Sequence, residues 1–79
     1  MALPEPVRSR VVALAATALG AMAPEEVPPP LRKVARFTPA KRARLGAADL
    51  LTAVEGDPVF RQRVVATARK ADADAVVLA

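Results

Sequence analysis

The sequence predicts an all-α protein, a small bundle of four to five short helices. Apolar residues recur at spacings of three and four, and the pairs Thr38-Pro39 and Asp57-Pro58 have the chemistry of helix starts. No segment alternates polar and apolar residues as a half-buried strand does. At 79 residues the chain has room for only one domain, so we expect residues 1–79 to form a single helical domain.

The first helix is expected over residues 5–19. Pro4 and Pro6 are tolerated in a first helical turn, where Glu5 also complements the helix dipole. Gly20 then suits the C-terminal end. The apolar positions that follow helical spacing are Val7, Val11, Leu14, Ala15, Ala18, Leu19 and Met22.

The same segment imitates a secretory signal peptide. Arg8 and Arg10 precede the run VVALAATALG, and Ala21-Met22-Ala23 resembles a cleavage site. Three features favour an amphipathic helix instead: Pro24 would follow the cut, Glu5 lies in the supposed basic region, and the run is rich in Ala rather than Leu. The run is also shorter than the roughly 20 apolar residues that span a membrane, so we expect no membrane association.

Prolines divide the middle of the chain. Pro24-Glu25-Glu26 is able to open a single turn, and Pro28-Pro29-Pro30 prevents a helix from running through but allows one to begin. A second helix is expected over 30–36. Its buried positions would be Leu31, Val34 and Ala35, and its outward positions Arg32, Lys33 and Arg36.

Two capped starts define the rest. Thr38 is expected to cap a helix that begins at Pro39 and reaches about Leu45. A break near Gly46 separates this helix from the next one, which ends at Glu55. After Gly56, Asp57 caps a helix over about 58–70, whereas the tail 71–79 either extends that helix or marks where a longer protein was cut. The face of this last helix is Phe60, Val64, Thr67 and Ala68, and the expected core is Leu14, Leu31, Leu51, Phe60 and Val64.

Composition argues against an enzyme. Cys, His, Tyr and Trp are absent, and Ser9 is the only serine, so nucleophilic and general-base catalysis lack their usual groups. We therefore expect no catalytic residue, no metal site and no cofactor. The absence of Cys fits a reducing cytoplasm. Ile and Asn are also absent while Ala, Arg, Val and Pro abound, a bias towards GC-rich codons that indicates a high-GC bacterium.

A basic cluster is the main functional signal. The net charge is +4, and no acidic residue occurs between Val27 and Ala48. The cluster comprises Arg32, Lys33, Arg36, Lys41, Arg42 and Arg44. A block of one sign attracts either the phosphates of a nucleic acid or the acidic face of a protein. Phe37 lies within the cluster, where it either stacks on a base or belongs to the core.

Both kinds of partner stay open on this evidence. With RNA, the basic residues and Phe37 would form the nucleic-acid-binding site, through phosphate contacts and with little reading of bases. With protein, the domain would dock an acidic partner or mediate oligomerisation. If the cluster proved not to bind, a second basic set, Arg61, Arg63 and Arg69, would be the alternative surface.

Three stretches resemble a known family: LPEPVRSRVVALAATALG, EEVPPPLRKVARFTPAKRARLG and LLTAVEGDPVFRQRV. They are similar to the N-terminal helical region of actinobacterial proteins that carry a NYN domain, a PIN-like nuclease fold, and are described as predicted RNA-binding proteins. The resemblance covers about residues 3–65. It implies that this chain is the N-terminal part of a longer protein, an accessory domain for a nuclease-like domain whose metal-binding acidic residues have no counterpart here.

Overall fold

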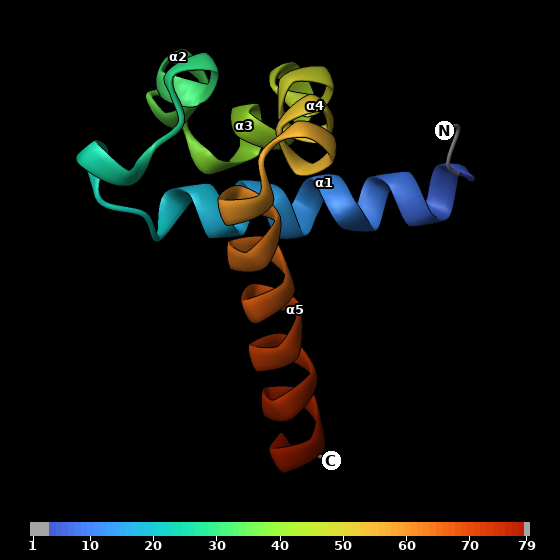
Figure 1. The fold of residues 1–79 in the computed structure, drawn as a ribbon. Helices are drawn as coiled ribbons and strands as arrows, with labels where there is room; N and C mark the ends of the chain where they lie inside the picture. Colours follow the sequence, from blue (N-terminus) through green and yellow to red (C-terminus); the bar gives the residue numbers. More distant parts are fainter. Residues whose placement is uncertain (1–3, 79) are drawn as a thin grey trace.

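The protein is an all-α bundle, as the sequence predicts. The computed structural model describes residues 4–78, with side chains for residues 4–73. Its elements are α1 (Glu5–Gly20), the 3-10 turns η1 (Pro24–Glu26) and η2 (Pro29–Leu31), α2 (Arg32–Ala35), α3 (Pro39–Leu45), α4 (Ala47–Gly56) and α5 (Pro58–Leu78). Every element in this part of the chain is helical. Helix α1 is central: α2, α3 and α4 lie along one side of it, while α5 crosses it and extends beyond (Figure 1).

Most predicted boundaries are confirmed. The first helix ends at Gly20, the single turn after Pro24 forms, and the break falls at Gly46. The expected second helix is split into η2 and α2: the Leu31 N–H donates to the Pro28 carbonyl in a 3-10 turn, and Leu31 itself, with φ −100° and ψ 0°, leaves helical geometry before α2 begins at Arg32. Helix α5 starts at Pro58 and continues to Leu78, so the first part of the tail extends the last helix.

The core centres on the crossing of α1 with the other helices. Leu31, Phe60 and Val64 are buried as predicted. Leu14 and Leu51 are partly buried and pack against the core, so they lie at its edge and not at its centre. The buried leucines of the described residues are Leu19, Leu31 and Leu50. The cause is a rotation of the buried face, since α1 turns Val12, Ala15, Ala16, Ala18 and Leu19 inwards.

Close approach between helices explains the break at Gly46. This glycine is buried, and its φ is negative, so a left-handed conformation is not the reason for it. A Cβ atom at this position would lie 2.5 Å from Val34 Cγ1 and 2.8 Å from the carbonyl oxygen of Arg42. Only glycine lets the start of α4 pack this tightly against α2.

The two predicted caps behave differently. The Asp57 carboxylate accepts hydrogen bonds from the backbone N–H groups of Val59 at 3.0 Å and Phe60 at 3.1 Å, which confirms it as the cap of α5. Thr38 has the extended backbone of an N-cap residue, but its hydroxyl makes no capping bond. Pro39 and the fixed φ of its ring therefore define the start of α3 more than the threonine side chain does.

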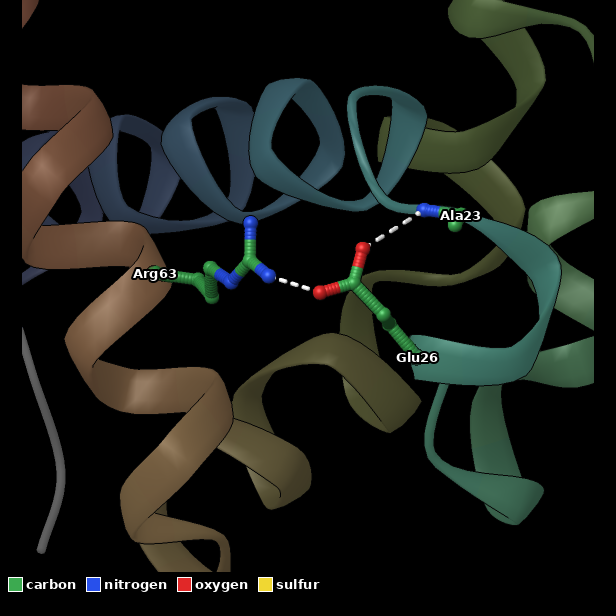
Figure 2. Close-up of polar contacts among 3 residues, drawn as sticks. All are labelled: Ala23, Glu26 and Arg63. Atoms are coloured by element: carbon green, nitrogen blue, oxygen red, sulfur yellow. Dashed lines mark hydrogen bonds and ion pairs between the residues drawn. The ribbon is translucent and has the colours of Figure 1, made fainter.

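Polar contacts hold the turn η1 against α5. One Glu26 carboxylate oxygen accepts the backbone N–H of Ala23 at 3.0 Å, and the other pairs with the Arg63 guanidinium of α5 (Figure 2). A second ion pair joins Arg10 of α1 to Asp72 of α5 at 3.6 Å. Both pairs are largely exposed and contribute at most about 1 kcal/mol each, and the first links the loop that follows α1 to α5. No helix within the described residues is long and apolar enough to cross a membrane.

Candidate nucleic-acid interface

The basic cluster lies on two short helices that meet at the Thr38-Pro39 turn. Helix α2 and the residue after it carry Arg32, Lys33 and Arg36, all exposed. Helix α3 carries the others, of which Lys41 and Arg44 are exposed and Arg42 is partly buried. Within the part of the chain that the structure describes, none of the six cations forms an ion pair. The cluster therefore presents positive charge with which no carboxylate of the described side chains forms an ion pair.

Three of the six cations converge on one groove of about 490 Å³, named here the arginine groove. Arg32, Arg36 and Arg42 are its charged members. The end of α1 supplies Leu19 and Gly20, the following loop supplies Met22, Pro24 and Val27, and α2 supplies Ala35. Leu19 and Val27 are buried and form the floor. The groove thus combines an apolar floor with a cationic rim.

Arg42 has a structural role beside its charge. Its Nη2 donates to the carbonyl oxygen of Ala35, the last residue of α2, at 3.0 Å. Such a bond satisfies an orphan carbonyl at a helix end. Its Nε is buried without a hydrogen-bond partner among the described residues. Arg42 therefore ties α3 to α2, and its removal would change the surface as well as its charge.

A second hollow of about 390 Å³ lies beside the arginine groove, between α1 and α3. The two share Gly20 and Arg42. The remaining lining residues are small or compact, namely Ala13, Ala16, Thr17, Pro39 and Ala43. A Cβ at Gly20 would come within 2.7 Å of Arg42 Nη1, so the guanidinium lies directly over this glycine. The two hollows are therefore neighbours with Arg42 and Gly20 at their boundary, and the pair is called the trough here.

Phe37 is not part of this trough. It is partly buried and packs against the core, and it does not line either hollow. Of the two interpretations of Phe37, the structure thus shows its packing role. Lys33, Lys41 and Arg44 also lie outside the lining of the arginine groove, on the exposed surfaces of α2 and α3.

The alternative basic set is engaged elsewhere. Arg61 donates from Nε to the carbonyl oxygen of Val54 at 2.8 Å and from Nη2 to that of Glu55 at 2.6 Å, at the end of α4. Arg63 pairs with Glu26. Of this set, only Arg69 makes no hydrogen bond or ion pair among the described residues.

The sequence did not reveal the apolar part of the groove. Gly20 and Met22 suggested only a helix end and a false cleavage site, and Val27 carried no signal. The loop 21–28 packs onto the core through the buried Val27, and the exposed pair between Glu26 and Arg63, 37 positions apart in the sequence, adds a contact to α5. Such a long-range contact leaves no local pattern. The six cations, by contrast, could be found because charge is visible in the sequence itself.

Comparisons with known proteins add no family to this description. No protein-family model, curated protein or solved structure matches the chain. The similarity to NYN-domain proteins therefore stays a prediction from the sequence. No group of three or more side chains that could hold a metal ion occurs among the residues searched, which are those the structure describes.

Proposed function

We propose that this chain is a non-enzymatic accessory domain that binds RNA, or single-stranded nucleic acid generally, through phosphate contacts from α2 and α3. The observation that carries the proposal is the cluster of six cations, none of them ion-paired within the described residues. Each phosphate neutralised by such a side chain releases counterions, which is the main driving force of non-specific nucleic-acid binding. The sequence resemblance favours RNA and a nuclease-like domain elsewhere in the protein.

The arrangement suits a phosphate backbone better than a sequence-reading site. Lys33, Lys41 and Arg44 are exposed on either side of the turn that joins α2 to α3, and Arg32 and Arg36 line the trough. Side chains spread along a trough follow a strand of regularly spaced charges, whereas few polar groups are placed to read base edges. Binding should therefore depend strongly on salt and weakly on sequence.

The test is fluorescence anisotropy of a labelled single-stranded RNA at several salt concentrations. The variant Lys41→Gln/Arg44→Gln removes two exposed cations of the cluster, and Arg42 is kept because of its bond to Ala35. The matched control, Arg69→Gln/Lys70→Gln, removes two exposed cations of α5. We expect the first variant to lower affinity for all sequences alike and to reduce the salt slope by about 0.7 for each lost phosphate contact, while the control stays close to wild type.

Two results would contradict the proposal. If RNA does not bind even at low salt, an acidic protein or a second copy of the chain becomes the better partner for the cluster. If the α5 control loses as much affinity as the cluster variant, binding follows net charge and not this surface. Thermal unfolding of both variants should match wild type, because exposed charges contribute little to stability.

A further inference from the structure

We propose that the arginine groove holds one unpaired base of the bound strand, with the neighbouring phosphates on Arg32 and Arg36. The inference rests on the proposed function and adds to it the kind of nucleic acid: a single strand with a base free to leave its stack. The starting observation is that the groove contains more apolar surface than phosphate binding requires. Phosphates need only the cationic rim, yet the groove beneath that rim is apolar and open.

The groove floor has the chemistry of a base-binding surface. Leu19 and Val27 lie almost completely beneath the surface, so the accessible apolar surface comes from the partly buried Met22 and Ala35 and the exposed Pro24. Their thioether, methyl and ring CH groups can pack on the flat face of a base without selecting its identity. The exposed Arg32 and Arg36 stand on the α2 side of the same groove. A guanidinium there can either pair with a phosphate or stack on the base.

The size of the groove favours a nucleotide over a protein. A specific protein interface generally uses about 20–30 residues on each side, whereas nine residues line this groove. Its volume of about 490 Å³ falls within the roughly 300–1,000 Å³ typical of small-molecule sites. Adding the neighbouring hollow lengthens the trough along α1, where the small side chains of Ala13, Ala16 and Thr17 leave room for the backbone of the strand.

A paired base cannot enter such a groove, because it is held in its duplex. Extruding it costs the energy of its pairing and stacking, which is lowest for a base that is already single-stranded. The groove therefore predicts selection of single-stranded RNA over double-stranded RNA of the same sequence. It predicts no strong preference among the four bases, since every base offers a flat face.

Gly20 provides the test, because it lies in both hollows. It is exposed, it is the last residue of α1, and a side chain there would meet only the flexible end of Arg42. The variant Gly20→Leu fills the trough and pushes the Arg42 guanidinium aside, while the net charge stays the same. Its matched control is Gly56→Leu, at the last residue of α4, where a Cβ meets nothing within 4 Å.

The probes are a labelled eight-uridine RNA, an eight-residue strand of the same charge that lacks bases, and an eight-base-pair RNA duplex. Wild type and Gly56→Leu should bind the uridine strand about tenfold more tightly than the strand without bases. Gly20→Leu should bind both strands with the weaker affinity and with an unchanged salt slope, because its charges are intact. Circular dichroism should show that both variants retain the helical fold.

The outcomes separate this inference from the proposed function. Equal affinity of wild type for the two single strands, or equal affinity for the duplex, would overturn the base-binding groove and leave the phosphate surface standing. A polyglutamate peptide that displaces the uridine strand at equal concentration would also overturn it, by showing a site for acidic protein. Failure of every strand to bind would overturn both proposals. The comparison of strands on the wild-type chain needs no variant, so misfolding of Gly20→Leu would not obscure the result.

Discussion

The molecule contains two helix junctions of the same design. In each, a capping residue is followed by proline, at Thr38-Pro39 and at Asp57-Pro58. In each, an arginine one turn into the new helix reaches back to the carbonyls at the end of the preceding helix or its last turn: Arg42 to Ala35, and Arg61 to Val54 and Glu55. We name them the first junction, residues 35–42, and the second junction, residues 54–61.

The junctions differ in how completely their polar groups are satisfied. At the second, the Asp57 carboxylate caps the helix and Arg61 makes two hydrogen bonds. At the first, the Thr38 hydroxyl caps nothing, and the surrounding cations have no ion-pair partner among the described residues. The second junction is thus built for stability. The first combines cations that have no ion-pair partner among the described residues with an open groove, and incomplete satisfaction of this kind is common at functional sites.

The largest expected difference between the junctions is in the loss of stability when the phenylalanine of each is replaced by alanine. Phe60 is completely buried within the second junction, whereas Phe37 is only partly buried within the first. Phe60→Ala should cost about 3–5 kcal/mol, enough to unfold a domain of marginal stability. Phe37→Ala should cost less and leave a cooperative transition. Thermal unfolding followed by circular dichroism measures both. If Phe60→Ala melted at the wild-type temperature, the core described here would be incorrect.

The next largest expected difference is in the free energy of unfolding of two glycine variants, one near each junction. Gly46→Ala places a Cβ 2.5 Å from Val34 Cγ1, next to the first junction, and should destabilise the fold by about 1–3 kcal/mol. Gly56→Ala, within the second junction, meets nothing within 4 Å and should be neutral or stabilise by up to about 1 kcal/mol. Urea denaturation of the two variants checks this contrast. Equal effects would show that Gly46 is not a point of close packing.

The smallest expected effect concerns the caps. Asp57→Ala removes a side chain that accepts two backbone N–H groups and should lower the free energy of unfolding by about 1 kcal/mol. Thr38→Ala removes a hydroxyl that makes no capping bond and should change it by only a few tenths of a kcal/mol. Urea denaturation of the Asp57→Ala and Thr38→Ala variants measures both changes in the free energy of unfolding. A larger loss for Thr38→Ala would mean that the two junctions are capped alike.

These contrasts also show what the sequence was able to predict. Proline after a capping residue is local chemistry, so both junctions could be located within a residue or two, and charge revealed the basic cluster. The choice of Leu19 over Leu14 in the core depends on how α1 is rotated against α5, which helical spacing alone does not determine. The groove depends on how the loop 21–28 packs onto the core through the buried Val27, which no local pattern of the sequence determines. The fold class was therefore predictable, whereas the apolar half of the candidate site was not.

The most direct test of this account is an NMR titration of the ¹⁵N-labelled chain with the eight-uridine RNA. The account predicts that backbone amide shifts concentrate at the end of α1, in the loop 21–28 and across the first junction, Ala35 to Arg42, with the exposed cations on either side. The amides of the second junction, Val54 to Arg61, should remain close to their free positions. Shifts centred on the second junction, or spread evenly over α5, would contradict the claim that the first junction is the ligand-binding one.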